Sequence, residues 1–505
     1  MRSTRQPVAI ALALTALLPT GCRVGPKYQR PPAMAQAPPP AAYKEAPAPD
    51  AAAGDWKVAQ PQDAMLHGKW WEIYGDTELN ALEDKLNIDN QTIKVYFENF
   101  MEARAIVAET RSQLYPTLTA APSYSRSRAS ANQSSTPSAA TGRTNSLTVL
   151  GLDAAWEPDL WGRVRNQISE AQYNAQVSAA DLENERLSEQ ASLAEYFFEI
   201  RGQDALMAVY QQTVADDQKS LDLTRSQYET GVGTQISVVE AQNTLQNAQS
   251  TLINLGVARA QYQHAIAVLT GVDPSSFSLP VRALSANPPP VPVGVPSQLL
   301  ERRPDIAASE RVMASANAQI GVATAAFYPN LTLTMDGGFE SAAWRHLFDI
   351  SSRFWSLGGS ASELIYDAGL RRATVMQYEA IYNGDVASYR QTVLAAFQQV
   401  EDALAAVRIL SQQIQQQEQA EKSAQQVVDL ETARYETGVD PYIDVVTAQN
   451  ALLADRQTLA TLHTEAMTAS VQLIEALGGG WDSTQLPTQQ QVTKKITPAE
   501  AVIQR

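Results

Sequence analysis

The chain has 505 residues, of which 44% are hydrophobic and 18% charged, and its formal net charge is −16. This length allows several domains. Because such an acidic chain repels phosphate backbones, we expect no nucleic-acid partner. No run of eighteen apolar residues occurs, so the usual length criterion predicts no membrane-spanning helix.

The N-terminus has the pattern of a secretory signal peptide over residues 1–21. Arg2 and Arg5 precede an apolar stretch at 8–18, and Thr20-Gly21-Cys22 follows. Cys22 is the only cysteine, which excludes a disulfide within one chain. Its setting resembles a bacterial lipobox, although Pro19 stands where Leu is usual. We therefore predict lipid attachment at Cys22; the alternative is a chance cysteine beside an ordinary cleavage site.

Cleavage before Cys22 would leave 36 basic residues against 54 acidic ones, a net charge of about −18. Residue 23 is Arg and not the Asp that is linked to retention of lipoproteins in the inner membrane. By this resemblance the predicted location is the outer membrane.

Proline marks the connecting segments. The chain is rich in Pro and Ala from 29 to 54, so we predict a lipid-anchored, extended tether over 22–69 that forms no core. A second cluster at 288–296 predicts a linker over 272–297. No proline occurs between Pro158 and Pro274 or between Pro329 and Pro441, and those stretches are rich in helix-favouring residues.

An internal repeat divides the chain. The pentapeptide Tyr-Glu-Thr-Gly-Val at 228–232 recurs at 435–439, an offset of 207 residues that several flanking residues share. Two copies of about 200 residues are too long for a solenoid and indicate a duplicated domain. We place the first copy at 70–271, the second at 298–480 and a polar tail at 481–505.

Each copy is predicted to contain a helix, a strand pair, a very long helix, a tight turn and a second helix. Strand pairs are expected at about 116–157 and 329–366, and long helices at about 163–270 and 369–477. Alternation is clearest in the second copy, where one apolar face would hold Leu331, Leu333, Met335, Gly337 and Phe339. In the first copy the better apolar face would hold Leu150, Leu152, Ala154 and Trp156.

Aromatic residues gather at the ends of these strands. One predicted level holds Tyr115, Trp156, Phe327, Tyr328 and Tyr366, and the other holds Trp344, Phe354 and Trp355. Two such levels resemble the girdles of a membrane β-barrel. The alternative is a soluble hairpin with ordinary aromatic packing.

The helices that follow the turns carry a sevenfold spacing, which indicates coiled-coil pairing. Many of these positions are small, so the helices can approach closely and build a curved wall. The seam positions are Val238, Leu245, Leu252, Ala241, Ala248, Leu255, Tyr262 and Leu269 in the first copy and Val445, Leu452, Leu459, Ala466 and Leu473 in the second.

The two turns are the predicted functional tips. Gly231 and Gly438 can each adopt the left-handed conformation that ends a helix. We expect Asp440 to cap the next helix, with Pro441 at its first position, and Thr234 or Ser237 to do so in the first copy. The tips themselves comprise Tyr228, Gly231, Val232, Tyr435, Gly438 and Val439.

Four strands cannot close a barrel, and an open sheet edge cannot lie in lipid because its N–H and C=O groups lack partners. If the strands cross a membrane, several chains must combine. Two chains would supply eight strands and three would supply twelve, and composition does not choose between them.

Three motifs resemble the outer-membrane efflux factors, the TolC-like family with its NodT-type lipoproteins. The first is Cys22-x-Val24-Gly25-Pro26-x-Tyr28-x-x-Pro31, and the second is Trp71 with Gly75-Asp76-x-x-Leu79-x-x-Leu82. The third is long: Leu299-Leu300-x-Arg302-Arg303-Pro304-Asp305-Ile306, Glu310, Ala318-x-Ile320-Gly321 and Tyr328-Pro329-x-Leu331. The resemblance covers residues 22–480.

This resemblance implies a mixed α/β membrane protein and a homotrimer, with a twelve-stranded β-barrel continuous with a twelve-helix periplasmic coiled-coil tunnel. It implies a passive export channel of a tripartite efflux or secretion system. The expected partners are outer-membrane lipid, a periplasmic adaptor (membrane fusion protein) docked at the tips, and an inner-membrane transporter of the resistance-nodulation-division (RND) type.

The resemblance also gives Asp444 a possible role, because it matches the acidic position of the family's tip motif, and Asp440 lies one turn earlier. Threefold symmetry would bring copies of both together as a periplasmic gate that attracts cations. The alternative for Asp444 is an acid of the first helical turn that the helix dipole favours.

No pattern of enzyme chemistry is present, so we predict no enzyme, no metal site and no cofactor apart from the lipid on Cys22. The four histidines His67, His264, His346 and His463 lack metal-ligand spacing, and no nucleophile elbow or phosphate loop occurs. A second hypothesis is a structural coiled-coil lipoprotein without channel activity.

Overall fold

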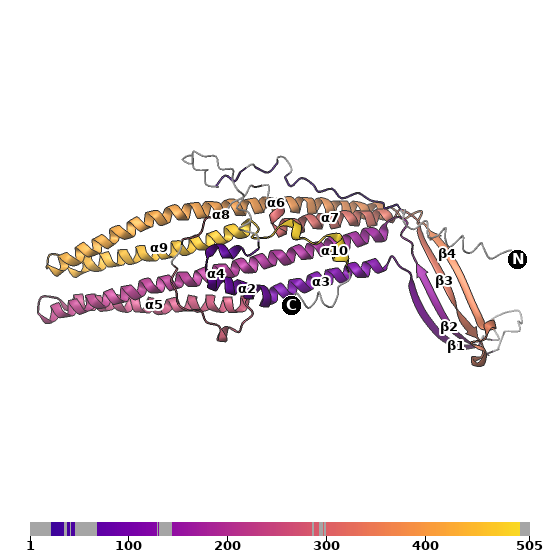
Figure 1. The fold of residues 1–505 in the computed structure, drawn as a ribbon, viewed down its shortest axis with the longest axis horizontal. Coiled ribbons are helices and arrows are strands. Elements are labelled where there is room, and N and C mark those ends of the chain that lie inside the picture. The colour runs from indigo at the N-terminus through magenta and orange to yellow at the C-terminus, as the bar shows by residue number, and fades with distance from the viewer. Residues whose placement is uncertain are drawn as a thin grey trace.

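The molecule is a long helical body that ends in a four-stranded sheet (Figure 1). The computed structural model describes residues 22–34, 38–40, 42–45, 68–128, 130, 144–284, 287–291, 296 and 299–494. The predicted signal peptide, His67 and most of the Pro-rich tether lie outside these residues. Among the described helices, none is both long and apolar enough to cross a bilayer.

The first copy begins with short helices and ends with a very long hairpin. Asn90 separates its first two α-helices, because its side chain caps the second one by accepting from the Ile93 N–H at 2.9 Å. The elements are η2 (Trp70–Tyr74), α2 (Thr77–Asp89), α3 (Gln91–Ser112), β1 (Thr117–Arg128), β2 (Thr144–Trp156), α4 (Arg163–Glu229) and α5 (Gln235–Leu269).

The second copy repeats this order after a short 3-10 turn, η3 (Pro274–Ser276). Its elements are α6 (Leu299–Arg302), α7 (Pro304–Ala325), β3 (Asn330–Ser341), η5 (Trp344–His346), η6 (Ile350–Ser352), β4 (Arg353–Ser362), α8 (Leu370–Glu436) and α9 (Tyr442–Ala476). The chain continues into η7 (Ser483–Gln485) and α10 (Gln489–Thr493). The predicted duplicated unit is confirmed, and α4 and α8 have 67 residues each, about 100 Å of helix.

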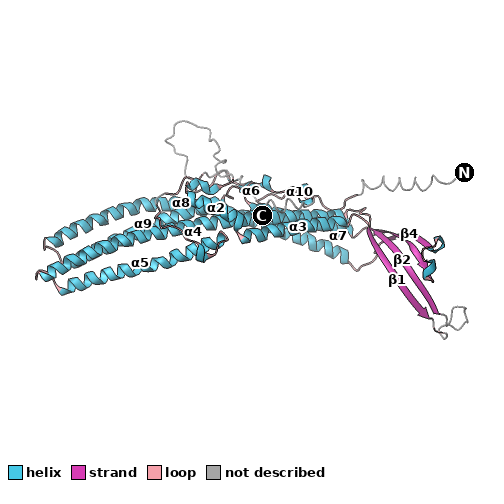
Figure 2. Ribbon diagram, turned by 60° about the horizontal axis from the view of Figure 1, so that its bottom comes forward, coloured by secondary structure: helices cyan, strands magenta, loops and turns pink. Residues whose placement is uncertain are grey.

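The helices form a wall one layer thick. Near the tips their order is α5, α4, α9, α8, and nearer the sheet it is α3, α4, α7, α8, as the packing pairs and Figure 1 both show. The four strands follow in the order β1-β2-β3-β4, all antiparallel. They form one sheet at the end of the helical body (Figure 2). One edge of the molecule therefore runs along α5, α3 and β1, and the opposite edge along α8 and β4.

The main core lies where the short helices cover the wall. It joins Trp70, Leu79 and Leu86 to Phe197 of α4 and Val471 of α9. Nearer the tips, the helices are held together by apolar seams. The predicted positions Ala241, Leu245 and Ala248 are buried on α5, and Val445, Leu452, Ala466 and Leu473 are buried on α9.

Three segments outside the repeats also pack on this body. Tyr43 of the predicted tether is buried beside Leu299 and Tyr389, so the prediction that this segment contributes nothing to a core is wrong at this residue. The aromatic ring of Tyr43 has a larger apolar surface than the surrounding Pro and Ala side chains, so its burial is more favourable. In the tail, Trp481 and Val492 are buried.

Candidate functional site

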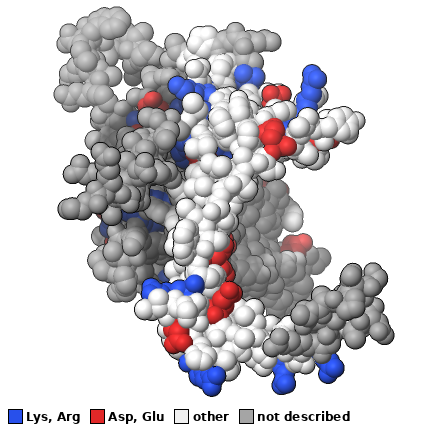
Figure 3. Space-filling view, turned by 90° about the vertical axis from the view of Figure 1, so that its right-hand side faces the viewer, with Lys and Arg blue, Asp and Glu red and all other residues white. Residues whose placement is uncertain are grey.

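The sheet has one apolar and one polar face. In the register, Leu118, Ala154, Met335 and Leu357 lie side by side, and so do Ala120, Leu152, Gly337 and Trp355. The predicted alternation of both copies is therefore confirmed, and the two apolar faces are continuous. The surface at the sheet end is largely uncharged, with charged side chains mainly toward the upper and lower ends of the view (Figure 3).

The opposite face of the sheet is polar and acidic. The pairing brings Asp153 directly opposite Asp336, with Thr119 and Ser356 as their outer neighbours. The Ser356 hydroxyl donates to Asp336 Oδ2 at 2.7 Å. Among the described strand residues that share this face, none is Lys or Arg. Like charges directly across a pair of strands destabilise a sheet, so this pair requires a solvated face.

The predicted aromatic levels occupy opposite ends of the sheet. Tyr115, Tyr328 and Tyr366 are exposed at the end that joins the helices, and Trp344 and Trp355 are exposed at the other end. Phe354 lies opposite Gly338, on the polar face and away from the apolar face that carries Trp355. It follows from the period of two that neighbours in a strand point to opposite faces.

Cys22 is exposed at the junction between sheet and helices. Its carbonyl oxygen accepts a hydrogen bond from Arg165 Nη2 at 3.1 Å. Two residues later, the backbone N–H of Val24 donates to Trp161 O at 3.0 Å. The Trp161 ring stacks on Tyr328 with centroids 4.9 Å apart. The predicted lipid-bearing residue therefore lies beside the end of β2 and the exposed aromatic residues there.

The N-terminal motif and the mid-chain motif contact each other. Gly25 adopts φ +108°, and a Cβ on it would lie 2.5 Å from the Cα of Gly321. Asn317 Nδ2 donates to Pro26 O at 3.0 Å, and the Tyr28 hydroxyl donates to Glu310 at 2.7 Å. The sequence showed both motifs but gave no sign that they pack together.

The Arg-Arg-Pro-Asp part of the mid-chain motif fixes the end of α9 to the start of α7. Arg303 forms an ion pair with Asp305 at 2.6 Å and donates to Ala476 O at 2.9 Å. A Cβ at Gly478, which has φ +93°, would lie 2.1 Å from Arg302 O. Since the donors of Arg303 satisfy a carbonyl at a helix end, this motif has a structural role here.

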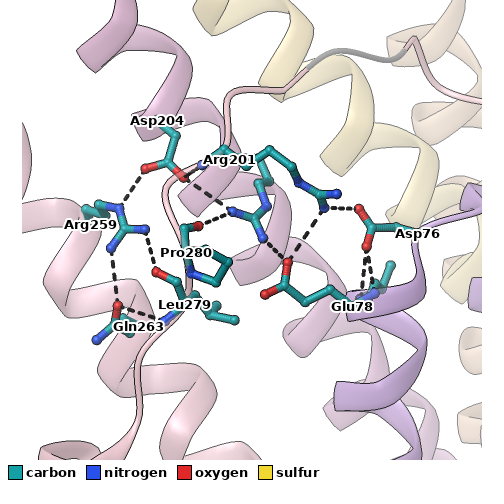
Figure 4. A network of polar contacts seen from close by, with 10 residues as sticks. Asp76, Glu78, Arg201, Asp204, Arg259, Gln263, Leu279 and Pro280 are labelled. Carbon is teal, nitrogen blue, oxygen red and sulfur yellow. Dashed lines mark hydrogen bonds and ion pairs between the residues drawn. The ribbon is translucent and has the colours of Figure 1, made fainter.

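A buried ionic network holds the segment between the copies, as Figure 4 shows. Arg201 and Asp204 of α4 are 2% and 1% exposed. Asp204 accepts from Arg259 Nε of α5 at 2.6 Å and from Arg282 N of the linker at 2.8 Å. Arg201 donates to Pro280 O at 2.8 Å and pairs with Glu78 of α2. We call these residues the collar network; the prediction that 272–297 is only a linker missed it.

Both tips have the backbone predicted for them. Gly231 has φ +79° and Gly438 φ +75°, and the N–H of the following valine donates to a carbonyl five residues back at 2.9 Å in each copy. A Cβ added to either glycine would lie near no other atom, so only the positive φ angle of the backbone favours glycine at these positions. Val232 and Val439 are 81% and 64% exposed.

The two predicted gate acids have different surroundings. Asp440 forms an ion pair with Arg434, whose Nη2 donates to Asp440 Oδ1 at 3.0 Å. Helix α9 begins at Tyr442 with Pro441 as its N-cap, so the predicted cap Asp440 and the predicted place of Pro441 at the first helical position are both wrong. The Asp440 carboxylate binds Arg434 instead. Thr234 does cap α5, accepting from Ser237 N at 3.3 Å. Asp444 is exposed in the first turn of α9.

The two hairpins contact each other mainly along α4 and α9, and near the tips a residue of α8 also contacts α4. Near the tips the Tyr435 hydroxyl donates to Gln227, and farther from the tips Gln457 Nε2 donates to the Tyr210 hydroxyl at 2.6 Å. The Arg434 guanidinium and Asp440, by contrast, stay within one hairpin. Sequence reasoning missed Gln227, Arg434 and Tyr210; the only available signal was that Gln227 and Arg434 occupy equivalent positions of the repeat.

Comparison with known proteins identifies the family. A sequence model for the outer membrane efflux protein family matches residues 84–272 and 295–479. The chain belongs to the outer membrane efflux protein family. It is 31% identical over 475 residues to the Probable efflux pump outer membrane protein TtgC of Pseudomonas putida, covering 94% of this chain and 95% of that protein.

Two further family members support the assignment. Outer membrane protein OprJ of Pseudomonas aeruginosa is 30% identical over 488 residues and covers 95% of this chain and 97% of its own length. The solved structure of the outer-membrane channel OprN superposes with a TM-score of 0.80 at 27% identity, covering 91% of this chain and all of that chain. This chain therefore functions as an efflux channel of the outer membrane, in a family of channel proteins and not of enzymes.

Proposed function

We propose that three copies of this chain assemble into one passive outer-membrane duct that docks a periplasmic adaptor and, through it, an inner-membrane transporter. The single observation that carries the proposal is the open sheet: among the described strands, β1 and β4 each have one neighbour only. Unpaired strand edges cannot lie in hydrocarbon. Three sheets joined edge to edge would give a twelve-stranded barrel, whereas a lone four-stranded sheet cannot close.

The helical wall supports the same assembly, because its open edges coincide with those of the sheet. On the α5 edge, Ile253 and Val257 are exposed, and on the α8 edge Leu394 and Leu430 are exposed. These edges differ, so joining one to the other is a head-to-tail contact that closes into a ring when the rotation fits. In the proposed trimer the twelve long helices continue the barrel as a tunnel.

The proposed transport is diffusion through a solvated interior. The polar sheet face, with Asp153 and Asp336, would line the barrel, and the apolar face would meet lipid. We infer that energy comes from the inner-membrane transporter, since the chain carries no phosphate-binding motif. We propose an RND-type transporter, which co-purification of the intact complex would identify.

We propose that Cys22 carries the lipid of an outer-membrane lipoprotein. Its exposure beside the aromatic residues at the helix end of the sheet supports this, because such residues mark the headgroup level of membrane barrels. Intact-mass spectrometry of the purified protein should show added acyl mass, and Cys22→Ala should remove it.

We further propose that the tips dock the adaptor through Tyr228, Val232, Tyr435 and Val439, and that Gly231 and Gly438 hold their backbone. The exposure of two valines at helix ends supports docking, since isolated apolar side chains at a rigid tip suit a protein contact. Asp440 and Asp444 would form the gate, with the Arg434–Asp440 pair holding the second tip closed.

The test is single-channel conductance of the purified protein in planar bilayers, together with its mass in detergent. We expect a trimer that conducts rarely at rest and more often after Asp440 and Asp444 are both changed to Ala. A monomer, or a trimer that never conducts even in that double variant, would refute the duct. The structural-lipoprotein alternative predicts this second outcome, and the continuous apolar sheet face speaks against it.

A further inference from the structure

A basic pocket lies on the helical body close to its junction with the sheet. The end of α3, the first turns of α4 and the tail around α10 form it, together with the N-terminal segment. Helix α10 lies in the half of the body nearer the sheet (Figure 1). The pocket has a volume of roughly 600 Å³ and is open to the surface. We call it the junction pocket. Its charged and apolar lining residues are Arg23, Arg111, Arg165, Lys494, Leu114 and Ile168.

The charge of the junction pocket has one sign. Among the described residues that line it, four are Lys or Arg and none is Asp or Glu. The whole chain has 54 acidic residues and only 38 basic ones, so this cluster is opposite to the charge of the protein. Because a concave site lined by one sign of charge concentrates ions of the other sign, the junction pocket favours an anion.

Arg23 is held in place by uncharged partners. Its Nε donates to Asn166 Oδ1 at 2.5 Å and its Nη2 donates to Ser169 Oγ at 2.9 Å, and both partners are buried. Among the described residues, no carboxylate lies within ion-pair distance of the Arg23, Arg111 or Lys494 side chains. The guanidinium of Arg23 is therefore oriented before any anion binds, and its charge is not neutralised within this part of the chain.

The tail places Lys494 beside the pocket through contacts that do not involve the lysine side chain. Val492 is buried against Val107 of α3, and Gln172 Nε2 of α4 donates to Thr493 Oγ1 at 2.8 Å. These contacts fix the backbone on both sides of α10. The charge of Lys494 can therefore be removed without loss of the contacts that hold the tail.

The position of the pocket relative to the sheet indicates the source of the anion. Arg23 directly follows Cys22, the residue proposed to carry lipid. Arg111 lies four residues before the exposed Tyr115, about 6 Å at the rise of a helix. The headgroup layer of a leaflet is about 5–8 Å thick. If the aromatic residues at the end of the sheet mark the boundary of the hydrocarbon, the junction pocket lies at the depth of the lipid phosphates.

We propose that the junction pocket binds the phosphate of an anionic phospholipid from the leaflet next to the helical body, with Arg23, Arg111 and Lys494 around the phosphate. This inference rests on the proposed insertion of the sheet into the membrane and extends it. Leu114 and Ile168 add apolar surface to the same pocket, which suits the glycerol and the first acyl carbons of a lipid. A free phosphate ion would leave that surface unused.

The experiment is native mass spectrometry of the purified channel in a neutral detergent, titrated with phosphatidylglycerol. The spectra give the oligomeric state and the number of lipids bound to each chain. We expect binding to saturate near one lipid per chain. Phosphatidylcholine should bind at least fivefold more weakly, because its own choline neutralises the phosphate.

The decisive variant combines Arg111→Gln with Lys494→Gln, two exposed side chains. Each Lys or Arg near an anionic lipid contributes about fivefold in affinity, so the double variant should bind phosphatidylglycerol at least tenfold more weakly. The matched control combines Lys85→Gln with Lys94→Gln, two exposed lysines of α2 and α3 outside the pocket. It removes the same charge and should stay within twofold of the wild type.

The outcomes separate the inference from the proposed function. If the wild type is a monomer, the proposed duct fails and the inference fails with it. If the wild type is a trimer and the double variant binds phosphatidylglycerol within twofold of it, the duct stands and the pocket inference is overturned. Displacement of the lipid by millimolar inorganic phosphate would indicate a site for the free ion and would also overturn the inference. Should the double variant form no trimers, Lys494→Gln alone should lose about fivefold in affinity, and an unchanged affinity there overturns the inference.

Discussion

The two long hairpins have identical lengths but opposite places in the wall. Helices α4 and α8 have 67 residues each, α5 and α9 have 35 each, and every boundary differs by 207 residues. In the first copy the long helix α4 is central and the short α5 forms an edge, whereas in the second copy the short α9 is central and the long α8 forms an edge. The lengths of the helices are therefore set by the distance that the tips must reach. The side chains of each helix are set by the neighbouring helices that it contacts.

The collar network shows how far the copies have diverged. Asp204 and Arg259, an ion pair in the first copy, correspond to Ser411 and Ala466 in the second. There the equivalent level is apolar, with Ala466 packed against Ile414 and Leu462. The described linker residues Pro280 and Arg282 contact the first hairpin at this level, where charged side chains satisfy their backbone carbonyl and N–H groups.

Removing the centre of the collar network should have the largest effect. Asp204→Ala removes the carboxylate partner of Arg259, one of the two carboxylate partners of buried Arg201 and the acceptor of the Arg282 N–H, which should destabilise the protein by about 3–5 kcal/mol. The equivalent change Ser411→Ala should stay within about 0.5 kcal/mol. Thermal unfolding of the trimer in detergent, followed by circular dichroism, measures both. Equal losses in the two variants would contradict the asymmetry between the copies.

Much of this architecture could be predicted from the sequence, because it follows from repeated patterns. The pentapeptide at 228–232 and its copy fixed both turns, and the alternation at Leu331, Leu333 and Met335 identified a strand face. The boundaries of the strands came out within a few residues. Such features depend on local preference and on a period, which one chain displays by itself.

The contacts between distant segments could not be predicted. Nothing in the residues around Gly25 shows that its backbone lies against Gly321, and Asp204 looks like any other acid of a solvated helix face. Asp440 was expected as a helix cap because Asp before Pro favours one, but Arg434, six residues earlier in the same hairpin, binds the same carboxylate. Pairing of charges across 50 or more residues leaves no local pattern.

A second comparison concerns Asp217, whose counterpart in the second copy is Ala424. Burial, with a smaller effect from Asp216, raises its folded-state pKa to about 6 from the ordinary value of 3.8, so the folded protein binds this proton more tightly than the unfolded chain. Wild-type stability therefore falls as pH rises from about 4 to 6 and stays lower above that window. Asp217→Asn, which cannot ionise, should be more stable than wild type by about 2 kcal/mol at pH 8 and equal to it below pH 4.

The sign of this stability difference tests whether ionised Asp217 has a partner in the folded protein. Chemical unfolding of the trimer at pH 4 and pH 8 provides the measurement. A variant that is less stable than wild type at pH 8 would show that ionised Asp217 has a partner in the free protein.

Substitution of the two tip glycines tests whether the two copies are equivalent at their tips. Ala at Gly231 or Gly438 must adopt a positive φ, and its Cβ would meet no other atom. We expect each substitution to cost about 1 kcal/mol through the backbone alone. The two losses should agree within about 0.5 kcal/mol in the same unfolding experiment. A clear difference would show that one tip contacts something that the other does not.

The smallest expected effect separates the two tips by their electrostatics. Arg434 holds Asp440 within the second hairpin, while its counterpart Gln227 accepts from Tyr435 across the hairpins. The Arg434 side chain of this pair is exposed to solvent, so Arg434→Ala should have a small effect and raise the open probability at most about fivefold. High salt should erase this gain because it screens the same pair in the wild type. Gln227→Ala removes an uncharged hydrogen bond, so its smaller effect on conductance should persist at 1 M salt. If both variants lose their effect in high salt, or if neither does, then one kind of interaction holds both tips closed. The two tips would then not differ as an ion pair within one hairpin and an uncharged hydrogen bond between hairpins.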